Sequence, residues 1–247
     1  MIYNVLSIRK EKLKMEQIYT IPVNEAFEKS LADPSCGCPF CTLYKKLQND
    51  NLDIILGASM MEPDIRIKTN KLGFCNKHYG MMFEKKNRLG LALMLESHLD
   101  ELRDDIGKKL ISLAPVGDNA RKRLDSLART CYVCDRIEFS LSKMLETALY
   151  LYEKDTEFAK KFKAQPYFCL NHFNRLSALA KAKMPKKLFA DFYDDLSLTT
   201  FGYFDELRGD IKHFIKKFDY RYEDEPWGNS KDSVERAIKF LEGDLEE

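Results

Sequence analysis

The chain has 247 residues, and 40 lysine and arginine residues nearly balance 39 aspartate and glutamate residues, giving a formal net charge of +1. Its 45% hydrophobic and 32% charged residues are typical of a folded globular protein and exclude a disordered one. The near-neutral charge argues against a protein that coats DNA through a basic surface. Seven cysteines beside only four histidines are the unusual numbers.

The first residues carry no targeting signal that we recognise. Met1–Lys14 has an apolar start followed by basic residues, without the apolar core or cleavage site of a signal peptide. We interpret residues 1–17 as a flexible N-terminal extension and hypothesise that Met15 is the native start. No run approaches the length needed to cross a bilayer, so we expect no membrane association. An odd number of cysteines without a secretory signal favours a reducing cytoplasm.

Apolar residues recur at intervals of three and four along most of the chain, which predicts amphipathic helices. The clearest stretches are 91–113, 137–152, 204–218 and 234–241. Proline and glycine lie between these stretches, and alternation typical of strands is scarce. The sequence therefore predicts an all-α protein.

A cysteine and histidine pattern occurs twice. Cys38-Pro-Phe-Cys41 is followed after 33 residues by Cys75-Asn-Lys-His78, and Cys131-Tyr-Val-Cys134 is followed after 34 residues by Cys169-Leu-Asn-His172. A third similarity, between 99–106 and 204–211, keeps the same order. The pattern predicts a helical bundle built from a tandem duplication with pseudo-twofold symmetry, its helices pinned by metal-ligand clusters.

This repeat divides the chain into four predicted segments. The extension 1–17 precedes a first repeat over 18–115, and a second repeat covers 120–222. The seam between the repeats lies at Pro115–Ala120. A polar turn and a final amphipathic helix occupy 223–247.

The repeated pattern supplies three thiolates and one imidazole twice, which is a complete tetrahedral shell for Zn²⁺. The predicted ligands are Cys38, Cys41, Cys75, His78, Cys131, Cys134, Cys169 and His172. We expect each pair at the start of a helix, with proline tolerated in the first turn and Asn76 capping free amides. Two zinc ions per chain are predicted, with an iron–sulfur cluster as the alternative. Redox pairs or inert buried cysteines are further readings, and the pattern leaves open whether each repeat closes its own site.

The other candidate residues have plainer interpretations. Cys36 is a spare thiol or a substitute ligand. His98 is expected to pack in the core rather than bind metal. The carboxylates of the similar segments 99–106 and 204–211 could orient a metal-bound imidazole or form ordinary ion pairs on a helix.

No phosphate-binding loop, nucleophile elbow or catalytic zinc motif is present in the sequence. A closed site with four protein ligands also gives zinc no open position for water. The sequence therefore favours a binding or adaptor protein over an enzyme. A protein partner fits the balanced charge better than nucleic acid. The alternative is a redox- or metal-responsive regulator that carries an iron–sulfur cluster and binds nucleic acid.

Several phrases of the sequence resemble a bacterial family known only as a domain of unknown function, seen largely in Firmicutes and Actinobacteria. They are Ile-Pro-Val-Asn-Glu-Ala-Phe at 21–27, Cys-Pro-Phe-Cys at 38–41, Gly-Phe-Cys-Asn-Lys-His at 73–78 and Asp-Glu-Pro-Trp-Gly at 224–228. The resemblance covers about Ile18 to Gly243. It implies a cytoplasmic bacterial protein whose cysteines and histidines bind metal, with no activity to transfer. The sequence departs from the family pattern at Tyr132 and Tyr167, which replace a proline and a glycine.

Overall fold

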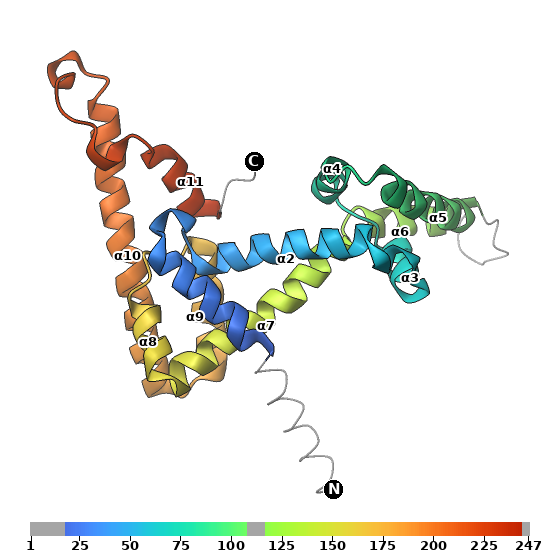
Figure 1. The fold of residues 1–247 in the computed structure, drawn as a ribbon, viewed down its shortest axis with the longest axis horizontal. Coiled ribbons are helices and arrows are strands. Elements are labelled where there is room, and N and C mark those ends of the chain that lie inside the picture. The colour runs from blue at the N-terminus through green and yellow to red at the C-terminus, as the bar shows by residue number, and fades with distance from the viewer. Residues whose placement is uncertain (1–17, 108–116, 244–247) are drawn as a thin grey trace, which may run out of the picture. The chain divides into compact units, whose positions relative to one another are not determined.

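The protein is all-α, as predicted. The computed structural model describes residues 18–107 and 117–243, and no strand occurs within these ranges. A helix over 18–32 comes first. The following α-helices, labelled in Figure 1, are α2 (Pro39–Leu56), α3 (Pro63–Leu72), α4 (Asn76–Glu84), α5 (Arg88–Gly107), α6 (Asp118–Leu127), α7 (Tyr132–Lys154), α8 (Thr156–Lys163), α9 (Leu170–Lys183), α10 (Lys186–Lys216) and α11 (Ser233–Glu242). Short 3₁₀ helices occur at Pro34–Cys36, Ala58–Met61, Tyr220–Tyr222 and Gly228–Ser230.

The chain forms two compact units. Unit 1 combines residues 1–44 with 141–247, and unit 2 comprises residues 45–140. Each unit therefore contains parts of both predicted repeats, and the repeat boundaries and the duplication stay predictions. Several of the predictions concern residues that the structure does not describe. They are the extension 1–17 with the hypothetical start at Met15, the apolar residues Leu110 and Leu113, and the first seam residues 115–116.

Unit 1 is built on a core of aromatic rings. Phe162, on α8, stacks on Phe168 at a centroid distance of 4.7 Å and contacts Phe192 of α10 at 5.1 Å. Phe27 reaches the same core from the helix over 18–32, 4.8 Å from Phe158. These rings are fully buried, so their removal from water is a main source of stability for this unit.

Unit 2 has a smaller, aliphatic core in which α5 packs on α3 and α6. Its fully buried side chains include Leu52 and Ile55 of α2 and Met82 of α4. The predicted apolar face of α5 is only partly buried, since Leu91 is 7% exposed and Leu99 is 60% exposed.

Two glycines allow the turns that precede ligand pairs. Gly37 and Gly73 have positive φ angles of 71° and 62°, a region that other residues rarely adopt. A side chain at Gly37 would place its Cβ 2.6 Å from the hydroxyl of Tyr167, and one at Gly73 would come 3.0 Å from Leu127. Both positions therefore favour glycine for backbone conformation, and a side chain at either one would force its neighbour to shift.

Candidate metal centres

All four ligand pairs lie at helix N-termini. Cys38 and Cys131 immediately precede α2 and α7, while Cys75 and Cys169 are the N-cap residues of α4 and α9. The second ligand of each pair follows three residues later, in the first helical turn, so both side chains point to one place. This position was predicted, although the N-cap of α4 is Cys75 itself and not Asn76. Free backbone N–H groups at a helix start favour thiolate over thiol.

Each Cys-x-x-Cys pair meets the Cys-x-x-His pair of the other repeat. The unit 1 site consists of Cys38, Cys41, Cys169 and His172, and the unit 2 site consists of Cys75, His78, Cys131 and Cys134. Within each site the donor atoms all lie within 4.8 Å of one another. The structure thus answers the question that the sequence left open: the candidate ligand pairs are exchanged between the two predicted repeats.

The unit 1 site has the dimensions of a tetrahedral zinc shell. With Zn–S near 2.3 Å and Zn–N near 2.0 Å, tetrahedral geometry places two sulfurs about 3.8 Å apart and sulfur and nitrogen about 3.6 Å apart. The sulfurs of Cys41 and Cys169 are 3.6 Å apart. His172 Nδ1 lies 3.6 Å from the sulfurs of Cys38 and Cys41 and 3.1 Å from that of Cys169. The donors therefore already surround a volume of the right size for one ion.

The unit 2 site repeats this geometry. The sulfurs of Cys75 and Cys134 are 3.9 Å apart. His78 Nδ1 is 3.2 Å from the sulfurs of Cys75 and Cys131 and 3.5 Å from that of Cys134. All seven cysteines are free thiols, and these sulfur separations are far longer than the bond of about 2.05 Å in a disulfide.

The unit 1 site is part of the buried interior. Cys38 and Cys169 are 1% and 0% exposed, and the ring of Phe40 lies 5.5 Å from that of His172. Burial raises the pKa of Cys38 well above its usual range, whereas hydrogen bonds from Cys38 and Cys41 lower the pKa of Cys169. A bound cation must therefore displace protons from buried thiols, and its binding free energy includes that cost.

The unit 2 site is nearer to solvent on one side. Cys134 is exposed and Cys75 is partly exposed, while Cys131 and His78 are buried. Burial raises the pKa of Cys134 to about 12. Burial and the neighbouring charge of Lys77 lower the pKa of His78 to about 4, which keeps the imidazole neutral and able to bind a metal.

Gln48 is a site residue that the sequence analysis missed. This buried side chain of α2 lies with its amide nitrogen 3.1 Å from His78 Nε2, on the opposite side of the ring from the sulfurs. With a metal on Nδ1, the Nε2 atom carries the proton and donates a hydrogen bond, which the Gln48 amide oxygen can accept once the amide group is rotated by 180°. Gln48 precedes Leu52 and Leu56 by one and two helical turns, and a polar residue in that apolar stripe was the available signal.

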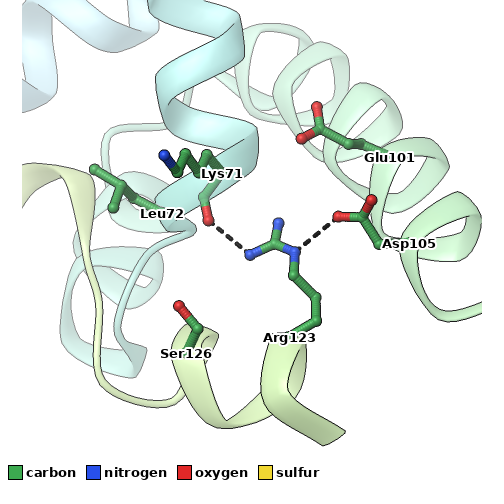
Figure 2. Close-up of a pocket in the computed structure, with 6 residues that line it drawn as sticks. All are labelled: Lys71, Leu72, Glu101, Asp105, Arg123 and Ser126. Carbon is green, nitrogen blue, oxygen red and sulfur yellow. Dashed lines mark hydrogen bonds and ion pairs between the residues drawn. The ribbon is translucent and has the colours of Figure 1, made fainter. Parts of the chain in front are cut away.

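Hydrogen bonds also hold the backbone segment that leads from α3 to Cys75. Arg123 of α6 donates to the carbonyl oxygens of Asn70 and Lys71 at 2.8 and 2.7 Å, and to Asp105 of α5 at 2.8 Å. Figure 2 shows its guanidinium between the Lys71 carbonyl and the Asp105 carboxylate, in a hollow that Leu72, Glu101 and Ser126 also line. This arginine therefore ties three helices of unit 2 together next to the site.

The remaining candidates lie outside both sites. Cys36 contacts Asp33 at 3.5 Å rather than a metal-ligand group. His98 donates from Nδ1 to the carbonyl oxygen of Asn70 at 3.0 Å, so it is a partly buried structural histidine, as expected.

One carboxylate of each similar segment forms an ion pair with a neighbouring helix. Asp105 pairs with Arg123, and Asp210 pairs with Arg236 of α11 at 2.8 Å. Asp105 and Asp210 occupy equivalent positions in the segments 99–106 and 204–211. Each of these aspartates therefore joins two helices within one unit and pairs with an arginine rather than with a ligand histidine.

Among the helices that the structure describes, none is long and apolar enough to cross a membrane.

The chain was compared with known families, curated proteins and solved structures, and a family model matches it. No curated protein and no solved structure matches the chain. The family of unknown function DUF6062 matches residues 14–247, nearly the whole sequence. The chain therefore belongs to this family, whose function is not known.

Proposed function

We propose that each site binds one zinc ion through three thiolates and the Nδ1 atom of a histidine. The observation that carries this proposal is the donor spacing: the distances between donor atoms run from 3.1 to 3.9 Å at the two sites, close to the edges of a tetrahedron around a single ion. Three sulfurs and one imidazole are soft donors that suit zinc and disfavour magnesium or calcium. The eight ligands are those predicted from the sequence.

The role that we propose for these ions is structural. Four protein donors fill the tetrahedral shell and leave no position for water or substrate, which is the arrangement of structural and not catalytic zinc. Each ion would hold two helix N-termini that are distant in sequence. Binding free energies of about 10–16 kcal/mol are found for structural zinc in small domains, which is comparable to the stability of a whole domain.

The donor spacing favours a single ion over an iron–sulfur cluster. Ligands of a cluster bind different irons, so their sulfurs lie farther apart than those around one ion. The compact donor sets found here leave no room for several irons and bridging sulfides. A regulator with such a cluster is therefore the weaker alternative.

We further propose a binding or adaptor role toward a protein partner in a reducing cytoplasm. The seven free thiols suit a reducing compartment. The net charge of +1 gives no field for nucleic acid, and α10 exposes the apolar side chains of Leu198 and Ile215. A photo-crosslinking residue at position 198 should give a defined protein adduct in cells. Binding of nucleic acid that weakens steeply with salt would contradict this proposal.

Elemental analysis of protein purified from its own host tests the metal proposal. We expect a colourless protein with two zinc ions per chain. Cys169→Ser should lose one ion, and Cys36→Ser is the matched control that should keep both because Cys36 lies outside the sites. Protein without metal, or a brown protein with visible absorption, would refute the proposal.

A further inference from the structure

We infer that the two sites differ in kind: the unit 2 site exchanges its metal with soluble thiol ligands, whereas the unit 1 site releases its metal only when the core of that unit opens. This inference rests on the proposed metal binding. It adds to the structural role of the unit 2 ion a regulatory function, namely binding and release of zinc while unit 2 stays folded. Three independent features of the structure carry it.

The first feature is access to the ligands. In unit 1 none of the four ligands is exposed: the values are 1% for Cys38, 7% for Cys41, 0% for Cys169 and 6% for His172. In unit 2 Cys134 is exposed and Cys75 is partly exposed. An incoming ligand can therefore approach the unit 2 ion directly but reaches the unit 1 ion only after the core opens.

The second feature is what surrounds the unit 1 ligands. Phe168 precedes Cys169 and stacks on Phe162, while Phe40 lies between Cys38 and Cys41 in sequence and packs 5.5 Å from Phe27. The ligands of this site thus belong to the aromatic core itself. Their separation would expose several buried rings, so metal loss is coupled to opening of the unit.

The third feature is a set of contacts that keeps the unit 2 ligand pairs together without a metal. The four carbonyl groups from Asn70 to Gly73, which lead to Cys75, all accept hydrogen bonds. The donors are His98 and Arg123 to Asn70, Arg123 to Lys71, Thr130 to Leu72 at 2.7 Å, and the backbone N–H of Tyr132 to Gly73 at 3.0 Å.

These bonds connect the two halves of the site directly. Thr130 and Tyr132 flank Cys131, so the segment that carries one ligand pair is hydrogen-bonded to the segment that leads to the other. The relative position of the pairs is therefore fixed by protein contacts as well as by the ion. A site that keeps its geometry when empty can be refilled without refolding.

The exchange needs no oxidant or reductant. The thiol of an incoming small molecule gives up its proton and forms a zinc–sulfur bond, while the bond from zinc to Cys134 breaks and the Cys134 sulfur takes a proton. The exposed sulfur is the leaving group because solvent can reach it. Further exchange at the partly exposed Cys75 would release the ion.

Stopped-flow transfer of zinc from the full chain to an excess of the chromogenic chelator 4-(2-pyridylazo)resorcinol tests this inference. We expect two phases, each of one zinc per chain, with rates that differ by about tenfold or more because only one site is accessible. Millimolar glutathione should accelerate the fast phase and leave the slow phase unchanged. Two ions that leave at the same rate would overturn the inference while leaving the proposed metal binding intact, whereas absence of bound metal would refute the proposed function itself.

Variants assign the phases to the sites. Thr130→Val removes the hydroxyl that contacts the carbonyl oxygens of Leu72 and Ser126 and leaves every ligand in place, and we expect it to accelerate the fast phase alone. Thr147→Val is the matched control, because Thr147 makes a similar bond to Lys143 within α7 of unit 1 and should leave both phases unchanged. Hydrogen exchange after the fast phase should still show protected amides in α3 and α5. Loss of that protection, or an effect of Thr130→Val on the slow phase, would contradict the assignment.

Discussion

Replacement of Arg123 by methionine should destabilise unit 2 and weaken its metal site. The Arg123 side chain is only 15% exposed and donates three hydrogen bonds between 2.7 and 2.8 Å, to Asn70, Lys71 and Asp105. Methionine has nearly the same helix propensity and length, so the variant removes the charge and the donors while keeping the apolar stem.

The size of the effect can be worked out from the partners. A hydrogen bond from a charged group contributes about 1.5–3 kcal/mol, but Asp105 is 38% exposed and the Lys71 carbonyl bond is on the surface, so their contributions are screened by solvent. We therefore expect a total loss of about 3 kcal/mol, which corresponds to about a hundredfold increase in the opening equilibrium of the unit.

Hydrogen exchange followed by mass spectrometry can measure this loss in unit 2 alone. Arg121→Met is the matched control on the same helix, because Arg121 is 73% exposed and lies 3.9 Å from Asp118. It should change stability by less than about 0.5 kcal/mol. The single tryptophan, Trp227, lies in unit 1, so its fluorescence unfolding curve should be the same in both variants. Equal protection of α3 and α5 in the two variants would refute the reasoning.

Three further predictions concern single side chains. Gln48→Met removes the amide group that lies beside Nε2 of His78, across the ring from the metal-binding Nδ1. The variant should weaken zinc binding at the unit 2 site by about 10- to 100-fold in a chelator competition. An unchanged affinity would show that Gln48 does not position the ring. Phe162→Ala empties a fully buried position in the aromatic core and should cost about 3–5 kcal/mol in urea unfolding followed by Trp227 fluorescence; a loss below about 1 kcal/mol would contradict the described packing. Burial lowers the pKa of His98 below its ordinary value of 6.5, so the unfolded chain binds a proton first and unit 2 should lose stability as the pH falls below about 6.5. His98→Gln should remove that part of the pH dependence in hydrogen exchange between pH 7 and 5, and an identical pH dependence would exclude His98 as its source.

The local features of the sites could be predicted from the sequence. A spacing of two residues between ligands places both ligand side chains in one helical turn. Apolar residues at intervals of three and four predict the helices. Both features depend only on residues that are close in sequence. His98 and Cys36 could be set aside on the same basis. Gln48 was missed because its partner, His78, is 30 residues away.

The pairing of the ligands was decided by the tertiary structure. Pairing within one predicted repeat and pairing between the two predicted repeats would each supply three thiolates and one histidine to a site. The local sequence pattern therefore cannot distinguish the two pairings. A helix of 18 residues such as α2 is about 27 Å long, which carries the chain away from Cys38 and Cys41 before the ligands of the same repeat follow. The cysteine at position 41 instead meets a histidine 131 residues away, because packing between distant helices, and not spacing along the chain, brings the two together. The sequence determined which residues are candidate ligands and that each candidate pair lies at the start of a helix, whereas long-range packing determined which pairs come together in one site and how far each site lies from solvent.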